Sequence, residues 1–452
     1  MSAAPPRARP PAPDGATARG PGAPDSRAVR ALLLSSGVGT VIEWYDFFVF
    51  ASAAALVFDK IFFPRFDPLS GVLLSLTTYA VGFVTRPLGG VVFGVLGDRY
   101  GRKRALVWSL VLMGLATVAI GLVPSYATIG VAAPILLVIL RLTQGLAVGG
   151  EVGGAVLLVA ESLSAQRRGY WTAWPQVGGP AGNLAAAGVL ALLAAALTDR
   201  QFSEWGWRVA FLLSGLLVGV GVWMRTRVEE SPLYRDYVER RRQARAGRPT
   251  LGQTLAAHWR AVLVVLLVKA GENALFYVFT TFFVVYVTRV LHLPRSLALG
   301  ATLVASAAEV VTIFAAGALS DRVGRRPVTA LGLVSAAVWT FVLFPVTAAG
   351  NPTAVTLAAV VGGVCHGFIV GGMSPFFVEL FPTSARYTGF SVGYQLASVV
   401  SGAVAPLIGV ALLDAFGSTV PVSIYAAAMA VPALACVWRS RETRGADLAV
   451  VE

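Results

Sequence analysis

"GDRYGRKR", at residues 97–104, has a near copy in "SDRVGRRP", at residues 320–327. The first copy places five charged residues within eight positions, although the chain as a whole is 13% charged. Each copy lies in a short loop between two long apolar segments. A charged turn that recurs in the same setting indicates a chain made of two similar halves.

The composition around these turns is that of a membrane protein. Of the 452 residues, 56% are hydrophobic, and the mean hydropathy is +0.72. Apolar stretches of about 20 residues, enough to cross roughly 30 Å of hydrocarbon as a helix, recur along nearly the whole chain. They are expected to be helical, because lipid offers the backbone no water to bond. This predicts an all-α membrane protein with twelve transmembrane helices in two pseudo-symmetric halves of six.

The predicted spans, good to a few residues, are 31–57, 69–95, 105–123, 132–161, 170–197, 207–225, 260–288, 296–319, 328–348, 353–380, 387–413 and 420–438. The domain organisation that follows is a disordered tail at 1–28, a first half at 29–225, a polar linker at 226–258, a second half at 259–438 and a tail at 439–452.

Arginine and lysine gather in the loops that join even-numbered to odd-numbered spans, whereas the opposite loops carry few of them. Basic loops stay in the cytoplasm. The sequence therefore predicts a multi-pass protein of the plasma or inner membrane with both termini in the cytoplasm. The net charge of +13 is then a topology signal that also attracts anionic lipid, and not a nucleic-acid footprint.

A second element repeats with the turn. Glu161, at the end of the fourth span, is followed seven residues later by Arg168. Glu379, at the end of the tenth span, is followed seven residues later by Arg386. Each half thus has a charged turn after its second helix and an E-x6-R exit from its fourth.

The repeated G-D-R-x-G-R-[KR] pattern in a twelve-span chain resembles the cytoplasmic loop signature of the major facilitator superfamily. Together, "GTVIEWYDFF", "RPLGG", "RLTQGLAVGGE", "WGWR" and "ELFPTSARYTG" resemble the metabolite:proton symporter family, which includes transporters of shikimate, 2-oxoglutarate, citrate and proline or betaine. The match spans roughly residues 31–440. It implies alternating access around a central cavity lined by the first, fourth, seventh and tenth helices, with the substrate near the midplane.

The resemblance also implies that the first turn latches the halves in the outward-facing state, with Asp98 docking near the start of the eleventh helix at residues 386–389. The aspartates suit helix capping or pairing with arginine, and the glycines suit a tight reversal. The candidate gating residues are Asp98, Arg99, Gly101, Arg102, Glu151, Glu161, Arg168, Asp321, Arg322, Gly324, Arg325, Glu379 and Arg386.

Ionisable residues inside the spans are costly to insert, so they are expected to face a cavity or a partner. Glu43 and Asp46 are three residues apart and share one helix face. Two carboxylates this close repel each other, so one of them is expected to take up a proton readily. We assign proton coupling to this pair with Arg141 as its partner, and to Glu309 as a second candidate. The alternative is a permanent ion pair with Arg86 or Arg141.

Arg86 lies deep in the second span, where its guanidinium fork suits a substrate carboxylate. The other candidate substrate-binding residues are Tyr45, Gln144, Lys269, Asn273, Tyr277, Tyr394 and Gln395. For each of them packing is the alternative, and Lys269 and Glu272 have the further alternative of neutralising each other. His366 is expected to pack or line the cavity wall, in preference to relaying protons.

These observations predict a proton-driven importer of a small organic metabolite, a carboxylate such as shikimate or a related acid. It is expected to act as a monomer in the bilayer, with protons and the organic solute as its partners. Three histidines, no metal-ligand spacing and no phosphate-binding loop argue against an enzyme, a cofactor or a metal. An exporter or uniporter, or a receptor that kept the fold without transport, remain as alternatives.

Overall fold

The protein is represented by a computed structural model that describes residues 26–66, 68–243, 250–402 and 404–448. Twelve of its helical segments are long and apolar enough to cross a membrane. The predicted number of spans and the helical class are therefore confirmed. Residues 1–25 of the predicted tail lie outside the described residues, and Ser26 already begins a helix.

The first six spans are built from α1 (Ser26–Leu56), α3 (Pro68–Val84) with α4 (Arg86–Tyr100), α5 (Arg102–Leu122), α7 (Ala132–Ser162), α8 (Arg168–Gln176) with α9 (Gly178–Ala196), and α11 (Trp207–Thr226). Short helices connect them: α2 (Phe58–Phe62), α6 (Tyr126–Ile129), the 3-10 turn η1 (Ala165–Arg167), α10 (Asp199–Gln201) and the π-helical turn η2 (Phe202–Gly206).

The last six spans are built from α13 (Leu251–Tyr277) with η3 (Val278–Phe282), α14 (Phe283–Val285) and η4 (Tyr286–Val290), then α15 (Arg295–Val323), α16 (Arg325–Ala348), α17 (Pro352–Glu379), α18 (Arg386–Ala397) with η5 (Ser398–Gly402) and α19 (Ala405–Phe416), and α20 (Val420–Arg439). Helix α12 (Pro232–Gln243) lies between the two sets.

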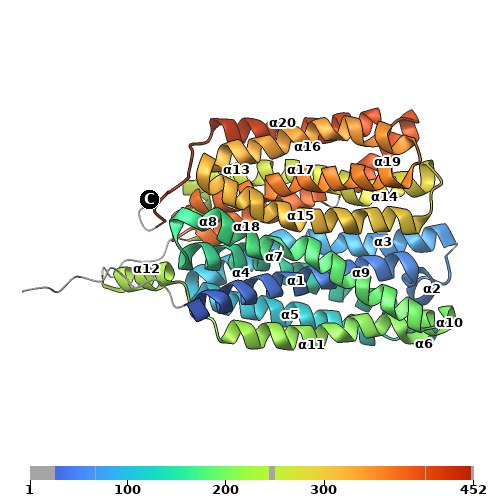
Figure 1. Ribbon diagram of the computed structural model, residues 1–452. Coiled ribbons are helices and arrows are strands. Elements are labelled where there is room, and N and C mark those ends of the chain that lie inside the picture. The colour runs from blue at the N-terminus through green and yellow to red at the C-terminus, as the bar shows by residue number, and fades with distance from the viewer. Residues whose placement is uncertain (1–25, 67, 244–249, 403, 449–452) are drawn as a thin grey trace, which may run out of the picture.

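The long helices run along one common direction, with α1, α5 and α11 on one side of the bundle and α16, α17 and α20 on the other (Figure 1). The two halves meet where α4 and α7 pack against α18, and where α8 packs against α15 and α17. Both arginine-rich charged turns lie at the end of the bundle that carries α12 and the last described residues. We call this end the basic end.

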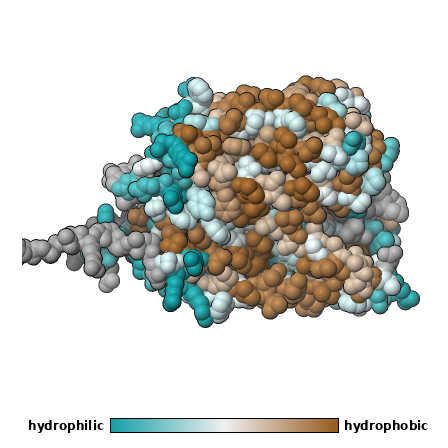
Figure 2. All heavy atoms as spheres, in the orientation of Figure 1, coloured by the Kyte–Doolittle hydropathy of each residue, from teal (hydrophilic) through white to brown (hydrophobic). Residues whose placement is uncertain are grey.

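The outer surface is apolar around the middle of the bundle and hydrophilic at the basic end (Figure 2). Large apolar side chains such as Leu88, Leu115 and Val311 are more than half exposed, at 57%, 65% and 68%. A continuous apolar surface of this kind is rare on soluble monomers. It is the surface that lipid tails cover.

The seventh helix begins earlier than hydropathy predicts. Thr250 caps α13: its hydroxyl accepts from the Gln253 N–H at 3.3 Å, and its own N–H donates to the Gln253 side chain at 2.9 Å. This reciprocal cap starts the helix in the polar stretch assigned to the linker. Part of the predicted linker is therefore helical, as α12 and as the first turns of α13.

The second, fifth, seventh and eleventh spans are interrupted part-way. The second span is interrupted at Thr85, two residues before Pro87, and the fifth span is interrupted at Val177, three residues before Pro180. In the other two spans π-helical turns follow Tyr277 and Ala397. Irregular backbone at membrane depth is tolerated where it lines a cavity. A ligand-binding cavity is therefore expected at the level of the bundle where these interruptions lie.

Both charged turns use a backbone conformation that favours glycine. Gly101 has φ 107° and ψ 152°, and Gly324 has φ 115° and ψ 158°. Each glycine ends one helix and begins the next, and a Cβ would collide with the Glu230 carboxylate at Gly101 and with the Glu442 carboxylate at Gly324. The glycines that recur in the two copies are therefore required by geometry.

We expect Gly101→Ala to lower the melting temperature, because an alanine in this backbone region is strained by about 1–3 kcal/mol. Gly188→Ala is the matched control, since a Cβ there meets nothing within 4 Å. Thermal unfolding of the detergent-solubilised protein, followed by tryptophan fluorescence, measures both. Equal melting temperatures for the two variants would contradict the strain at Gly101.

Candidate functional site

A cavity lies between the two halves at the level of the helix breaks. The space it encloses, together with the part open to solvent, is about 810 Å³. The first half lines it with residues of α1, α3, α4, α7, α8 and α9, and the second half with residues of α13, α15, α17 and α18. Its polar side chains are Glu43, Arg86, Gln176, Lys269, Glu272, Asn273, Tyr277, Glu309, His366, Tyr394, Gln395 and Ser398.

Arg86, the first residue of α4 after the break at Thr85, presents to this cavity a guanidinium that forms no ion pair with the residues the structure describes. Its guanidinium lies over the ring of Phe83 at 4.2 Å and over that of Phe47 at 4.8 Å. It is 7% exposed, and its Nε has no hydrogen-bond partner among the described residues. The rings hold the charge by cation–π attraction and leave its N–H donors available.

Three other polar side chains of the cavity wall also have an atom without a partner among the described residues. Glu43 Oε2, Asn273 Nδ2 and Gln395 Oε1 make no hydrogen bond within the described part of the chain, and all three residues are buried. Buried polar atoms are nearly always satisfied, so orphans that face a cavity mark where a ligand or water bonds. A carboxylate, an amide and a guanidinium thus converge on the same space.

The second half contributes a continuous chain of charged contacts. Lys269 Nζ lies 2.5 Å from Glu272 Oε2, and Glu272 Oε1 lies 2.9 Å from His366 Nε2. His366 Nδ1 lies 2.7 Å from Glu309 Oε1. The chain continues to Tyr394, whose ring lies 4.5 Å from the Lys269 ammonium. Glu309, which has no partner nearby in the sequence, finds one in the tenth helix.

Asp46 and Arg141 are linked beneath the cavity without touching. Arg141 donates to Gln144 at 3.1 Å, Gln144 donates to Thr117 at 2.7 Å, and Thr117 donates to Asp46 at 2.8 Å. Arg141 also lies over the ring of Phe50 at 4.2 Å. These groups border a smaller recess that Glu43 and Arg86 share with the main cavity. Glu43 therefore stands between the candidate coupling residues and the candidate substrate site.

Seven of the eight predicted substrate-binding residues lie at the cavity or at this recess. Arg86, Lys269, Asn273, Tyr277, Tyr394 and Gln395 line the cavity, and Gln144 borders the recess. Tyr45 is the exception: it is 1% exposed, and its hydroxyl donates to the carbonyl of Ala210 at 2.8 Å. It joins α1 to α11 inside the first half, so we remove it from the substrate site.

We expect Tyr45→Phe to leave substrate affinity unchanged and to destabilise the fold by about 1 kcal/mol, the usual net contribution of one hydrogen bond. Thermal unfolding measures the stability, and equilibrium binding measures the affinity. The matched variant is Tyr394→Phe, a similar change in a tyrosine that lines the cavity. A loss of affinity confined to Tyr45→Phe would return that residue to the site.

The first charged turn joins the two halves at the basic end. Asp98 accepts from the N–H of Thr388 at 3.1 Å and from its hydroxyl at 2.6 Å, at the start of α18. This is the position that the family resemblance implies. Arg102 donates to Asp98 at 2.6 Å and to the carbonyl of Thr383 at 3.0 Å. One turn of the first half thus holds the start of the eleventh helix.

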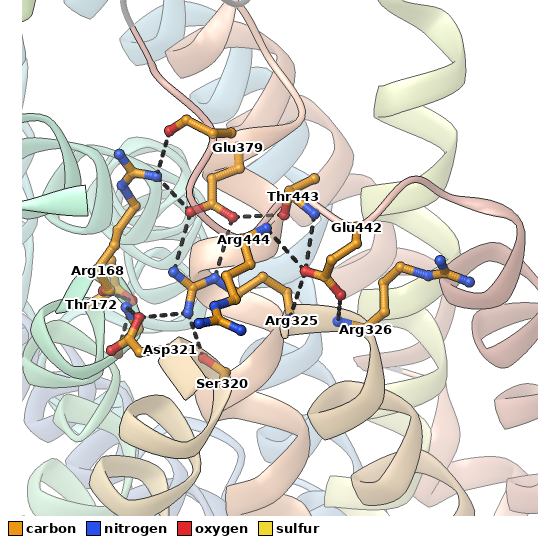
Figure 3. A network of polar contacts seen from close by, with 12 residues as sticks. Arg168, Thr172, Ser320, Asp321, Arg325, Arg326, Glu379, Glu442, Thr443 and Arg444 are labelled. Carbon is orange, nitrogen blue, oxygen red and sulfur yellow. Dashed lines mark hydrogen bonds and ion pairs between the residues drawn. The ribbon is translucent and has the colours of Figure 1, made fainter. Parts of the chain in front are cut away.

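The second turn repeats the arrangement with the halves exchanged (Figure 3). Asp321 accepts from the N–H groups of Gly169 at 2.8 Å and Tyr170 at 3.0 Å, at the start of the fifth span. Arg325 lies 2.6 Å from Asp321 and 3.3 Å from Glu379. The same interactions therefore close the basic end twice.

The two E-x6-R elements pair across the halves and not within them. Glu161 bonds Arg386 at 2.8 Å, and Glu379 bonds Arg168 at 2.6 Å. All four side chains are buried. We call the two turns together with these crossed pairs the gate.

The sequence contained a further repeat that hydropathy did not reveal. After the sixth helix, Glu230 accepts from the N–H of Lys103 at 3.2 Å, and Ser231 donates to Glu161 at 2.7 Å. An acid followed by a hydroxyl thus caps the helix after the charged turn and bonds the glutamate of the gate.

The same pair follows the twelfth helix. Glu442 accepts from the N–H of Arg325 at 2.8 Å, and Thr443 donates to Glu379 at 2.6 Å (Figure 3). The described tail then crosses the gate, where the carbonyl of Ala446 accepts from Arg168 at 3.1 Å. The signal in the sequence is the E-[ST] that follows the last helix of each half.

Three other predicted gating residues have different surroundings. Arg99 and Arg322 are exposed at the basic end. Glu151 pairs with Arg225 of α11 and accepts from Ser109 of α5 at 2.7 Å, all within the first half. The sequence position of Glu151 allows either a gating role or a helix-anchoring role, and these contacts support helix anchoring.

Removing the charge of Glu161 is expected to open the basic end, because a hydrogen bond between charged groups contributes about 1.5–3 kcal/mol. The reporter is Ser391→Cys in a chain whose two cysteines are replaced by serine, since Ser391 is 1% exposed and faces Gly153 of the other half. With Glu161→Gln we expect maleimide to label this cysteine roughly tenfold faster or more. Glu204→Gln, which breaks an exposed pair with Arg200, is the control. Equal rates in both variants would mean that the crossed pairs do not hold the gate.

Comparison with known proteins matches most of the chain. The family model described as "Sugar (and other) transporter" matches residues 33–257, and "Major Facilitator Superfamily" matches residues 274–450. The inner membrane metabolite transport protein YhjE of Escherichia coli strain K12 is 40% identical, covering 92% of this chain and 95% of that protein. The shikimate transporter of the same strain is 40% identical over 88% of this chain and 91% of its own, and its proline/betaine transporter is 32% identical over 94% and 86%.

Among solved structures, the proton:xylose symporter XylE bound to 6-bromo-6-deoxy-D-glucose superposes with a TM-score of 0.77 at 17% identity, covering 94% of this chain and 98% of that one. The fold is therefore that of the major facilitator transporters. With relatives this similar over nearly its full length, the chain belongs to the major facilitator superfamily and is a multi-pass metabolite transporter of that family.

Proposed function

We propose that the protein is a proton-coupled symporter that imports a small organic carboxylate by alternating access. The observation that carries the proposal is Arg86: a buried guanidinium over two aromatic rings, without an ion-pair partner among the described residues, in a cavity between the two halves. A guanidinium fork matches the two oxygens of a carboxylate. Shikimate, proline and betaine, the compounds in the relatives' names, each carry a carboxylate group.

The rest of the cavity suits a small polar acid. Asn273 offers an unpaired amide, and Trp44, Phe47 and Phe276 supply apolar walls against which a ring packs. The 40% identity to a shikimate transporter supports a cyclic, hydroxylated monocarboxylate as the first substrate to test. Since both halves of the cavity come from one chain, we propose a monomer as the transporting unit.

The coupling we propose runs through Glu43. When Glu43 is ionised it competes with the substrate carboxylate for Arg86, and when it is protonated Arg86 is available. The substrate then binds the protonated carrier more tightly, which is the differential affinity that symport requires. Asp46 and Arg141 border the recess behind Glu43, and the Asp46 carboxylate would hold the proton when it leaves the cavity side.

Alternating access would use the gate. We place the basic end in the cytoplasm, following the arginines of its loops. With the gate closed the cavity is cut off from the cytoplasm, and its opening would separate the halves α1–α11 and α13–α20. The crossed pairs Glu161–Arg386 and Glu379–Arg168 are then the contacts that break in each cycle.

Uptake of labelled shikimate into proteoliposomes, with and without an inward acid gradient, tests the proposal. We expect the gradient to drive accumulation, Arg86→Gln to weaken substrate binding roughly tenfold to a hundredfold, as for loss of a charged hydrogen-bond partner, and Arg86→Lys to retain part of it. Asp46→Asn is expected to abolish the response to the gradient. Proline and glycine betaine, which carry no net charge, are the comparison substrates.

The matched control is Arg208→Gln, which removes an arginine that bonds the carbonyls of Gly121 and Val123 away from the cavity. Uptake indifferent both to the gradient and to Asp46→Asn would refute symport. Uptake that responds to the pH gradient with the opposite sign would indicate an exporter. Substrate binding without counterflow would indicate a receptor.

A further inference from the structure

We infer that His366, Glu272 and Glu309 form a second proton-binding site, in the wall that the second half contributes to the cavity, and that its occupancy sets how tightly an anionic substrate binds. The site itself is independent of the transported compound. The effect on affinity rests on the proposed function, because it takes the substrate to be an anion.

The contacts of the His366 ring require an additional proton. Both ring nitrogens face carboxylate oxygens, Nε2 at 2.9 Å from Glu272 and Nδ1 at 2.7 Å from Glu309. A neutral imidazole has one N–H donor and one lone pair, and an ionised carboxylate has no donor. One of the two contacts would then bring two lone pairs together. A single proton, on the ring or on a carboxylate, turns both contacts into hydrogen bonds.

The same proton decides the charge of the cavity wall. Lys269 carries one positive charge and the two glutamates carry two negative charges, so the chain of contacts is neutral with the proton and has one net negative charge without it. All four residues are at most 6% exposed. An uncompensated charge is costly in such surroundings and repels another anion nearby. A substrate carboxylate therefore favours the protonated site.

The surroundings of His366 support this count. The other titratable groups that line the cavity are Glu43, Arg86, Tyr277 and Tyr394. The helices that also pack on α17 bring buried charged groups of their own, and most of these are paired: Arg168 and Arg325 with Glu379, Glu161 with Arg386, and Glu151 with Arg225. Arg141, also on α7, bonds Gln144, and the thiol of Cys365 adjoins His366 in the chain.

Two protonation steps then control one cavity. With Glu43 and the histidine site both deprotonated, the lining holds three carboxylates against two cations. With both protonated, one positive charge is in excess, which complements a monocarboxylate. Because Glu272, Glu309 and His366 all line the cavity, the proton can exchange with whichever side the cavity faces.

Two substitutions move the charge in opposite directions. Glu309→Gln removes one negative charge, so the chain of contacts is neutral without the extra proton. We expect this variant to bind shikimate at pH 8 more tightly than the unmodified protein does at pH 8, and to keep only the pH dependence that belongs to Glu43. His366→Gln leaves one net negative charge as long as both glutamates are ionised, and we expect at least tenfold weaker binding at pH 6.

Isothermal titration of the purified full-length protein with shikimate, at pH 6, 7 and 8, measures these affinities. A single linked proton changes the dissociation constant up to about tenfold per pH unit, and both substitutions are expected to flatten that dependence. Weakening of binding by both substitutions to the same extent would indicate a structural role and would overturn the inference. Glu43→Gln is the control for the other proton site and should leave the part of the pH dependence that belongs to His366.

An infrared titration without substrate separates this inference from the proposed function. The pH-difference spectrum is expected to contain imidazole and carboxylate bands that disappear in His366→Gln. Their absence from the unmodified protein overturns the inference even if shikimate is transported. Their presence in a protein that neither binds nor transports shikimate supports the site and counts against the proposed substrate.

Discussion

Charges that are removed from water and surrounded by apolar helices need an opposite charge, an aromatic face or a cavity. The arrangement of this protein follows from how its sparse charges meet that need. At the basic end nearly all are paired at hydrogen-bond distance, as Glu161 is with Arg386. At the level of the helix breaks they are not: Arg86 rests on rings, and Glu43 keeps an oxygen without a partner among the described residues. Where pairing is complete the bundle is closed, and where it is incomplete there is a cavity.

The two halves solve the problem differently inside the cavity. The first half leaves single charges on separate helices, so that each can meet a ligand. The second half connects its charges through His366, which lets Lys269, Glu272 and Glu309 share one balance of charge. The pseudo-symmetry that is so close at the gate is therefore absent at the centre. The gate is thus built from similar contacts in both halves, whereas the groups proposed to bind the solute and the proton differ between the halves.

Much of the fold and of the cavity lining could be predicted from the sequence. The features that could not be predicted depend on contacts between residues far apart in the sequence. Hydropathy and the repeated turn predicted twelve spans in two halves, because lipid permits few other structures. The helical phase predicted that Glu43 lies in the cavity, but it could not separate Tyr45 from the residues beside it, since one hydrogen bond to Ala210 decides where that ring points. The partner of Glu309 lies in another helix, and no local pattern links it to His366. The E-[ST] pairs at 230–231 and 442–443 are visible in the sequence, but they lie outside the apolar segments, so hydropathy does not mark them.

The exchange of partners between the two E-x6-R elements has an electrical consequence. Each half contributes one acid and one base to the crossed pairs, Glu161 with Arg168 from the first and Glu379 with Arg386 from the second. In the proposed transport cycle, opening of the gate separates two faces that are each neutral in these four residues, so they carry no net charge across the gap. The work of opening is then done against short-range hydrogen bonds and the dehydration of the ions, and not against a long-range Coulomb force. A gate built in this way is strong when closed and yet nearly insensitive to the electric field across the membrane.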